Sequence, residues 1–372
     1  MTRIYVGMSG GVDSSLAAAL LLERGFEVTG IYMKNWSQDL PGMKCPWAED
    51  LADAKRVAVQ LGIDFKVFDF EKEYKHYVVD YMVEEYKAGR TPNPDIMCNQ
   101  EVKFKLFLAA ALADGADAIA TGHYARVRCE ASRCAIHHYP VASHGAEDGV
   151  DDSTKQCTKA SLRVAEDHDK DQTYFLYRVT GEALATTLFP LGDYTKQQVR
   201  EMATERGLWT ADKKESMGVC FVGSVGMRDF LGQYVKTRPG DIIDKATGST
   251  LGRHDGAIFY TLGQRHGLDI GGGLPYYVVG KDMAKNEVYV STNLNDTAMW
   301  RRELTLGQLQ WIDHVPRDSA GLTVRLRHRG ALLPCILSGT VVQLEEPERA
   351  PTAGQSAVFY LRGNCLGGGI VA

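Results

Sequence analysis

An apolar run, Ile4-Tyr5-Val6, leads directly into Ser9-Gly10-Gly11-Val12-Asp13-Ser14. This order predicts a buried strand, a glycine turn and a helix over about residues 16–23 that ends at Gly25. Two adjacent glycines allow a tight turn that exposes successive backbone N–H groups, and the helix that follows adds the positive end of its dipole. The turn is therefore predicted to hold an anion such as phosphate. The alternative is a glycine turn without a ligand.

Strand and helix signals alternate from residue 1 to about residue 125. Expected strands cover residues 27–33, 65–70 and 116–120, and expected helices cover about 49–61, 74–88 and 102–113. This alternation predicts an α/β fold, a doubly wound parallel sheet with helices on both faces. Ligands of such sheets bind beyond the carboxyl ends of the strands. We therefore expect four segments to meet at one edge: the glycine turn, Met33, Thr121-Gly122-His123 and the proline-rich loop 89–95.

The next part of the chain predicts a surface insert over residues 129–168, where periodicity is lost. A metal site is the alternative there, although the spacing of its cysteines and histidines matches no zinc-finger pattern. These residues are Cys129, Cys134, His137, His138, His144 and Cys157. Because loop length costs little free energy, a variable insert is the simpler interpretation.

The carboxyl-terminal half predicts a small helical part followed by strands. Residues 180–245 look mainly helical, and short strands separated by glycines follow from about Ser249. These strands are expected at 257–261, 276–279, 287–290, 322–326, 335–337 and 357–360, a pattern typical of a β-barrel. The glycine runs 271–273 and 367–369 are interpreted as turns. The expected domains are residues 1–180, a small mostly helical central domain over 181–255, and a β-rich region over 256–372 that ends in the barrel.

Composition limits the class of protein. The chain has 372 residues, 44% hydrophobic and 24% charged, which is typical of a globular protein. No apolar run reaches the length of about 20 residues that a membrane helix needs, and the first strand begins too early for a signal peptide, so a cytoplasmic location is expected. The net charge is −5, so binding of RNA would require a local basic patch. The eight cysteines include no Cys-x-x-Cys pair, which argues against a structural zinc site.

Two cysteines are candidates for chemistry. Cys98 follows the proline-rich loop and precedes the helix expected near Val102, where the field of the helix favours the thiolate form. The prolines stiffen the loop and lower the entropy cost of holding a reactive group in place. Cys220 lies among small and apolar residues that predict a turn into a strand. An inert, buried cysteine is the alternative at both positions.

Six motifs occur in one order along the chain. They are Gly7-Met8-Ser9-Gly10-Gly11-Val12-Asp13-Ser14, Thr91-Pro92-Asn93-Pro94-Asp95 with Cys98-Asn99, Thr121-Gly122-His123-Tyr124-Ala125-Arg126, Lys170-Asp171-Gln172-Thr173-Tyr174-Phe175-Leu176, Gly218-Val219-Cys220-Phe221 and Tyr260-Thr261-Leu262-Gly263-Gln264-Arg265. The first motif resembles the pyrophosphate loop (PP-loop) of enzymes that split ATP into AMP and pyrophosphate. The ordered set resembles the tRNA-specific 2-thiouridylases, the MnmA/TrmU family, over nearly the whole chain.

The resemblance implies a PP-loop, adenine nucleotide alpha hydrolase-like domain that binds ATP, with Mg²⁺ arriving on the nucleotide. It assigns ATP to Gly7, Met8, Ser9, Gly10, Gly11, Val12, Asp13, Ser14, Met33 and Gly122. The implied reaction adenylates O2 of the wobble uridine (position 34), and a persulfide on Cys220 then supplies sulfur to C2. Cys98 is implied as the second thiol, leaving a Cys98–Cys220 disulfide. Asp95 is implied as an acid/base or base-orienting group.

The resemblance also implies contacts to the anticodon region of tRNA. The implied tRNA-binding residues are Asn93, Pro94, Asp95, His123, Lys170, Asp171, Gln172, Arg327, His328 and Gln355. The family pattern leads us to expect an aromatic residue such as Tyr at position 328, so the histidine is a departure. The sulfur donor would be a cysteine desulfurase or a relay carrier protein.

An arginine pattern independently suggests RNA binding. Arg325, Arg327 and Arg329 alternate with Val324, Leu326 and His328, so a strand would place three guanidinium groups on one face, ~6–7 Å apart. Arginine is well suited to phosphate, and this spacing is close to that of successive phosphates. A solvated strand face without a ligand is the alternative.

Two other functions compete with this interpretation. One is another adenylating PP-loop enzyme, such as an amide-forming ligase or a tRNA lysidine synthetase, which needs no pair of reactive cysteines. The other is a nucleotide-sensing or RNA-binding module that holds ATP without cleaving it. Substitution of the two cysteines tests the first, and tRNA-dependent release of pyrophosphate tests the second.

Overall fold

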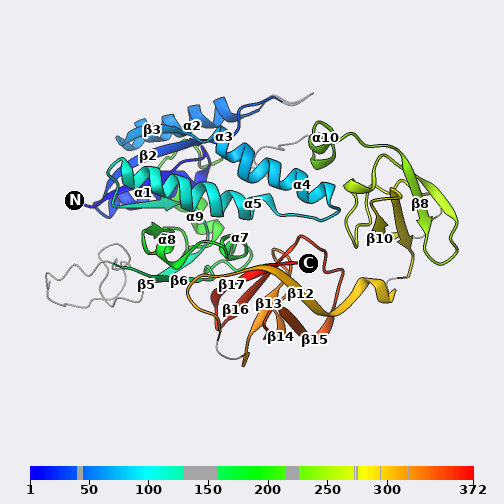
Figure 1. Ribbon diagram of the computed structural model, residues 1–372. Coiled ribbons are helices and arrows are strands. Elements are labelled where there is room, and N and C mark those ends of the chain that lie inside the picture. Colours follow the sequence, from blue (N-terminus) through cyan, green and yellow to red (C-terminus); the bar gives the residue numbers. More distant parts are fainter. Residues whose placement is uncertain are drawn as a thin grey trace.

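The computed structural model describes residues 1–39, 45–129, 157–214, 226–271, 273, 275–293, 295–316 and 319–372. Cys220 and most of the expected insert, with Cys134, His137, His138 and His144, lie outside the described residues. Figure 1 shows three parts: the N-terminal sheet with its helices, a small sheet around β8 and β10, and the C-terminal barrel. Within the described residues, the structure contains no helix long and apolar enough to cross a membrane.

The N-terminal part is built on a parallel sheet of five strands in the order β3-β2-β1-β4-β7. The strands are β1 (Arg3–Gly7), β2 (Glu27–Lys34), β3 (Asp64–Asp69), β4 (Ala118–Thr121) and β7 (Thr187–Leu188). The predicted doubly wound sheet is thus confirmed. Chain order reverses between β1 and β4, whose last residues Gly7 and Thr121 lie side by side. This reversal is where a parallel sheet opens a crevice for a ligand.

Helices cover both faces of this sheet (Figure 1). They are α1 (Val12–Glu23), α2 (Trp47–Leu61), α3 (Glu71–Tyr74), η1 (Lys75–Asp80), α4 (Tyr81–Lys87), α5 (Pro94–Met97), η2 (Cys98–Phe107), α6 (Leu108–Ala113), α7 (Thr173–Leu176), α8 (Gly181–Ala185), α9 (Lys196–Glu205) and α10 (Met227–Gly232). Helix α1 starts at Val12, four residues earlier than expected, because the glycine turn leads into it without a spacer.

The helix of Cys98 also begins earlier than the sequence suggested. α5, η2 and α6 run without a break from Pro94 to Ala113, whereas the expected start was near Val102. The side chain of Asn93 accepts a hydrogen bond from the backbone N–H of Asp95 (3.1 Å), and Pro94 takes the first helical position, where its missing N–H costs nothing. Cys98 therefore lies inside the helix, one turn from its start, and not in front of it.

A four-stranded sheet with the order β10-β11-β8-β9 forms the middle part. Its strands are β8 (Gly240–Asp244), β9 (Thr250–His254), β10 (Tyr277–Asp282) and β11 (Glu287–Ser291). Since β8 pairs with β11, the sheet runs across the boundary expected between residues 255 and 256. The strand expected at 257–261 is instead a short 3₁₀-helix, η3 (Ala257–Phe259), because consecutive residues Ala257 and Ile258 are both buried and leave no alternation.

The C-terminal strands form the predicted β-barrel. The order is β12-β15-β14-β13-β16-β17-β6-β5, and β12 also pairs with β17. The strands are β12 (Trp300–Trp311), β13 (Thr323–Arg325), β14 (Leu333–Ser338), β15 (Val341–Arg349), β16 (Ser356–Leu361), β17 (Asn364–Val371), β6 (Ala160–Arg163) and β5 (Arg126–Cys129). The N-terminal part thus contributes β5 and β6 to this sheet, so the two parts are joined by hydrogen-bonded strands.

The interpretation of Gly367–Gly369 as a turn is wrong, because these residues belong to strand β17. Glycine is needed there because a side chain at Gly368 would collide with the carbonyl oxygen of Ala357 and the ring of Tyr177. The glycines therefore permit close packing of strands. In addition, Cys129 and Cys157 form a disulfide across the base of the segment 130–156.

Candidate active site

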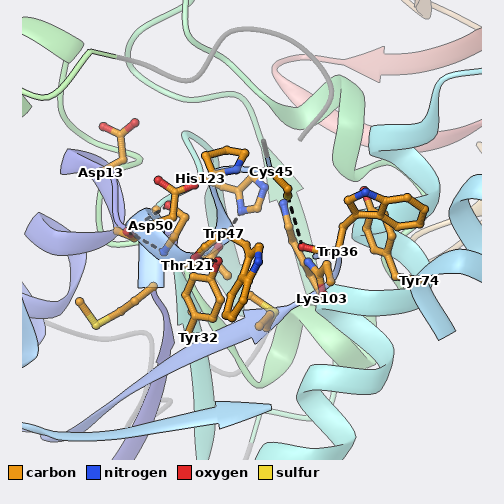
Figure 2. A pocket seen from close by; sticks show the side chains of 18 of the residues that line it. Asp13, Tyr32, Trp36, Cys45, Trp47, Asp50, Tyr74, Lys103, Thr121 and His123 are labelled. Atoms are coloured by element: carbon orange, nitrogen blue, oxygen red, sulfur yellow. Dashed lines mark hydrogen bonds between the residues drawn. The ribbon is translucent and has the colours of Figure 1, made fainter. Parts of the chain in front are cut away.

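A cavity of about 290 Å³ opens at the carboxyl edge of the parallel sheet. Its walls include residues of the glycine turn (Gly7, Met8, Ser9, Asp13 and Ser14), the end of β2 (Tyr32 and Met33), the segment after β4 (Thr121, Gly122 and His123) and the start of α2 (Trp47 and Asp50). The glycine turn, Met33 and Thr121-Gly122-His123 therefore meet at one edge, as expected. The fourth expected segment, the proline-rich loop 89–95, contributes no residue to the described cavity wall. Figure 2 shows Asp13 and Asp50 in one region of this cavity and Trp36, Tyr74 and Lys103 in another.

Hydrogen bonds hold the glycine turn in a fixed shape. The hydroxyl of Ser14 accepts from the backbone N–H of Ser9 (3.1 Å) and donates to the carbonyl of Gly11 (3.1 Å). Gly10 has φ +73°, and a Cβ there would collide with the carbonyl oxygen of Asp50. A Cβ at Gly122 would lie 2.8 Å from the backbone nitrogen of Ser14. The turn is thus packed between the start of α2 and the end of β4.

Each carboxylate of the cavity wall has a lysine partner. The Asp13 carboxylate accepts from Lys196 Nζ at 2.7 and 2.9 Å and from the Tyr124 hydroxyl at 2.8 Å. Asp50 accepts from Lys213 Nζ at 2.9 Å. The lysines belong to α9 and to the segment after it, and they offset the negative charge of Asp13 and Asp50 beside the glycine turn.

His123 is held as a neutral imidazole. Its Nδ1 is 2.7 Å from the hydroxyl of Thr121, and the ring packs against Phe104 and Phe189. Burial lowers the pKa of His123 well below its usual value, and the charge of Lys103 lowers this pKa further. This histidine therefore supplies a polar, uncharged wall at neutral pH.

Asp95 and Cys98 occupy successive turns of one helix and lie on the same face at i, i+3 spacing. Cys98 is 6% exposed, and burial raises the pKa of Asp95, which Lys103 partly opposes. Neither residue is among those that line the cavity in the described part of the chain. Lys103, on the same continuous helix, does line it and connects the two regions.

Sequence reasoning did not identify several residues of the cavity wall. Trp36, Cys45, Trp47, Tyr74 and Lys103 line it but belong to no motif that was singled out. The Cys45 thiol donates to the carbonyl of Trp36 (3.7 Å), and burial raises the pKa of this thiol, which disfavours the thiolate. Only the position of Trp36 and Cys45 in the chain could have indicated this role, because both follow β2, whose carboxyl end borders the cavity.

The residues on both sides of segment 215–225 contact the cavity wall. Before the segment, Lys213 pairs with Asp50 and with Asp53 (2.7 Å). After it, Phe230 of α10 packs against Trp36, with ring centroids 6.2 Å apart. Cys220 itself lies outside the described residues, but the chain enters and leaves its segment beside residues that line the cavity.

Comparisons with known proteins agree over the whole chain. Family models described as the tRNA methyl transferase HUP domain, the tRNA methyl transferase PRC-barrel domain and the aminomethyltransferase beta-barrel domain match residues 2–224, 228–292 and 301–371. A protein from Idiomarina loihiensis named tRNA-specific 2-thiouridylase MnmA is 44% identical, covering 99% of this chain and 95% of its own length. The chain belongs to the tRNA-specific 2-thiouridylase MnmA family. The family prediction is confirmed.

Other members of the thiouridylase family give the same result. Proteins of the same name from Legionella pneumophila (strain Lens) and Bacillus cytotoxicus are 44% and 42% identical, covering 99% and 100% of this chain and 98% and 94% of their own lengths. Among solved structures, the NMN synthetase of Francisella tularensis aligns with a TM-score of 0.33 and 15% identity, covering 58% of this chain and 66% of its own. A TM-score of 0.33 is too low to establish a shared fold.

Some of the tRNA contacts that the thiouridylase resemblance implied fall on buried groups. Asp171 is 2% exposed, and its carboxylate accepts from the backbone N–H of Ala165 (3.0 Å) and the hydroxyl of Thr173 (2.7 Å). Gln172 lines the cavity and accepts from the backbone N–H of Tyr124 (2.9 Å). The bonds from Ala165 and Thr173 hold the Asp171 carboxylate inside the fold.

The expected stripe of three arginines is wrong as a strand feature. β13 ends at Arg325, whose guanidinium lies over the ring of Tyr360 (5.1 Å) and pairs with buried Asp171 (3.4 Å). Arg327 is half-exposed and donates to the carbonyl of Arg349, and Arg329 has φ +60°. The strand does not continue, because residues 327–330 form a turn in which the backbone N–H of Gly330 donates to the carbonyl of Arg327 (2.9 Å). Arg325 pairs with its buried partner, so of the three arginines only Arg327 and Arg329 are exposed.

His328 already has a stacking partner in this member of the thiouridylase family. Its ring lies 4.5 Å from that of Phe175, centroid to centroid, and burial lowers the pKa of His328. The side-chain oxygen of Gln355 is buried without a hydrogen-bond partner in the described structure. Both residues are half-buried, whereas Arg327, next to His328 in the chain, is exposed.

Proposed function

We propose that this thiouridylase-family chain converts the wobble uridine of tRNA to 2-thiouridine, using ATP to activate O2 and a Cys220 persulfide to supply sulfur. One observation carries the proposal. The cavity that contains the phosphate-binding turn also contains Lys103, which belongs to the same continuous helix as Asp95 and Cys98. A nucleotide in the cavity is therefore adjacent to the helix that carries the implied chemistry.

The ATP phosphates would bind the backbone N–H groups of residues 10–14 and the start of α1. Met33 and Gly122 would contact the nucleoside, since both line the cavity. Mg²⁺ would enter with the nucleotide, and the phosphates would supply most of its ligands. Asp13 and Asp50 provide carboxylate oxygens nearby, and the described residues hold no cluster of three or more His, Cys, Asp or Glu suited to a metal.

In the first step, O2 of uridine attacks the α-phosphorus and forms an O2–P bond. The bond from this phosphorus to the bridging oxygen breaks, and pyrophosphate leaves with the electron pair. The proton on N3 of the base must leave at the same time. Asp95 is the group we assign to accept or position it, because burial raises its pKa towards the range that a general base needs.

In the second step, the outer sulfur of the Cys220 persulfide bonds to C2, and AMP leaves with the former O2. The Cys98 thiolate then attacks the inner sulfur, which forms a Cys98–Cys220 disulfide and frees the sulfur on C2. The transferred sulfur is reduced by two electrons, and the two cysteines are oxidised by two. A reductant must reopen the disulfide before the next turnover.

The base would leave the anticodon stack to reach Asn93, Pro94 and Asp95. His123, Lys170, Asp171, Gln172, Arg327, His328 and Gln355 are proposed to contact nearby tRNA. The sulfur would come from a cysteine desulfurase or a relay carrier, in the cytoplasm.

Incubation of the purified protein with ATP, unmodified tRNA, a reductant and a cysteine desulfurase with L-cysteine as persulfide donor, followed by nucleoside analysis, tests the function. We expect 2-thiouridine, with tRNA-dependent release of pyrophosphate. Cys98→Ser and Cys220→Ser should keep pyrophosphate release and lose repeated formation of 2-thiouridine, and Cys335→Ala, a buried barrel position, is the matched control. Pyrophosphate release without any thionucleoside from the unaltered protein would support another adenylating enzyme, and Cys98→Ser that turns over repeatedly would exclude the two-thiol mechanism.

A further inference from the structure

Lys103 occupies a distinctive position in the cavity. It lies on η2, five residues after Cys98, and its side chain lines the cavity beside Trp36 and Tyr74 (Figure 2). Among the described residues of the cavity wall, Lys103 is the sole lysine or arginine. The other charged groups there are the carboxylates of Asp13 and Asp50, which cannot attract a nucleotide. The positive charge of the wall itself therefore comes from this one residue.

The charge of Lys103 reaches groups on two different elements. It acts on Asp95, at the start of the Cys98 helix, and on His123, after β4. Since His123 is neutral, it cannot balance negative charge in the cavity. Lys103 thus lies where the nucleotide cavity and the Asp95–Cys98 face come together, the place where the adenylyl group would pass from ATP to the base.

We propose that Lys103 is a catalytic residue of the adenylation step, with its ammonium group bound to the non-bridging oxygens of the α-phosphoryl group. The inference rests on the proposed function and adds a residue to it. As O2 attacks the phosphorus and pyrophosphate leaves with the bridging oxygen, negative charge builds on these oxygens. An ammonium group placed beside these oxygens stabilises that charge more in the transition state than in bound ATP. The same ammonium stays on the phosphate when AMP leaves C2.

Lys103→Met and Lys103→Arg test the inference, with Lys105→Met as the matched control. Lys105 is two residues away on the same helix, is 64% exposed and pairs with Glu101 (2.6 Å), outside the cavity. We expect Lys103→Met to lower kcat for tRNA-dependent pyrophosphate release by about 10²–10³-fold, as loss of one preorganised transition-state donor does. Arg should recover part of the rate, and Lys105→Met should match the unaltered protein.

A second readout separates catalysis from folding. If Lys103 acts on the α-phosphoryl group, the KM for ATP should change far less than kcat, and the thermal unfolding midpoint should stay near that of Lys105→Met. The acid limb of the pH–rate profile should also move to higher pH in Lys103→Met, because Asp95 loses its positive neighbour. Unchanged kcat in Lys103→Met, or an equal loss in Lys105→Met, would overturn the inference. If the unaltered protein released no pyrophosphate with tRNA, the proposed function itself would fail.

Discussion

At the scale of single residues, lysines from distant parts of the chain set the charge of the cavity. Asp53, one turn after Asp50 on α2, accepts from Lys213 (2.7 Å) and from the indole N–H of Trp209 (3.1 Å). Burial works to raise the pKa of Asp53, but these hydrogen bonds outweigh it and hold the pKa below its usual value. No local sequence pattern indicates such pairs, because the partners are more than 150 positions apart.

Lys213→Met should lower the free energy of unfolding by about 1–2 kcal/mol at pH 7, because it leaves a buried carboxylate short of a donor. A carboxyl with a lowered folded-state pKa stabilises the fold above its unfolded pKa of about 3.9, and this contribution disappears as the pH falls through the folded-state pKa. The difference between the two proteins should therefore shrink below about pH 4. Urea unfolding measures this difference in free energy. Lys55→Met, at an exposed position on α2 two residues after Asp53, is the control. An equal cost at pH 3 and pH 7 would contradict this assignment.

At the scale of elements, the alternation of strands and helices was predictable and the local packing was not. The Ser9–Ser14 motif and the apolar run before it are enough to predict the first strand, turn and helix. The glycines of β17 were misread because a glycine that permits a turn cannot be distinguished, in sequence, from one that permits close contact with Tyr177. The arginine alternation failed for a related reason, since the ion pair of Arg325 with Asp171 joins residues 154 positions apart.

Gly10→Ala should separate two effects of this glycine, its left-handed backbone conformation and its close packing against α2. Gly10 and Gly25 both have positive φ, but a Cβ at Gly25 meets nothing within 4 Å, whereas at Gly10 it meets the Asp50 carbonyl. Both alanine variants should lose about 1–2 kcal/mol of stability from the left-handed backbone. Gly10→Ala should in addition weaken ATP binding at least tenfold, because α2 must move away from the turn, while Gly25→Ala should leave it unchanged. Calorimetric ATP titration gives the comparison, and equal affinities would exclude a tightly packed phosphate turn.

Arg327→Ala should weaken tRNA binding and reduce the slope of log affinity against log salt by about 1, as loss of one phosphate contact does. ATP binding should not change, because Arg327 lies on the barrel and not in the cavity. Arg3→Ala is the control, since Arg3 begins β1 at the opposite edge of the parallel sheet from the cavity. Filter binding at several salt concentrations measures the slope. A slope that does not differ between the two variants would remove Arg327 from the interface.

At the scale of the whole molecule, the loop before Asp95 is held by both other parts of the protein. The backbone N–H of Thr91 donates to the carbonyl of Ala353 in the barrel (2.9 Å), and the Thr91 hydroxyl is 3.2 Å from that of Thr261 in the middle part. The sequence predicted the parts and several residues of the cavity, yet it could not predict this junction, which depends on how folded units dock. The barrel and the middle part are therefore hydrogen-bonded to the loop that leads to Asp95 and Cys98.

Gly354→Ala should disturb this junction selectively. A Cβ at Gly354 would lie 2.8 Å from the Thr91 backbone nitrogen, whereas Gly339, also of positive φ on the barrel, has nothing within 4 Å. We expect Gly354→Ala to lower the rate of 2-thiouridine formation at least tenfold with little change in ATP affinity, and Gly339→Ala to retain the rate. Single-turnover assays with saturating tRNA make the comparison. Equal rates would show that the loop does not depend on the barrel.

The two-thiol mechanism requires that Cys98 and Cys220 act on the same base. Protein loaded with a Cys220 persulfide and freed of donor is given ATP and unmodified tRNA for one turnover, alkylated, and mapped by mass spectrometry without reduction. We expect a peptide that links Cys98 to Cys220, accumulates in step with 2-thiouridine and requires both ATP and tRNA. Formation of 2-thiouridine while Cys98 stays open to alkylation would contradict the two-thiol mechanism.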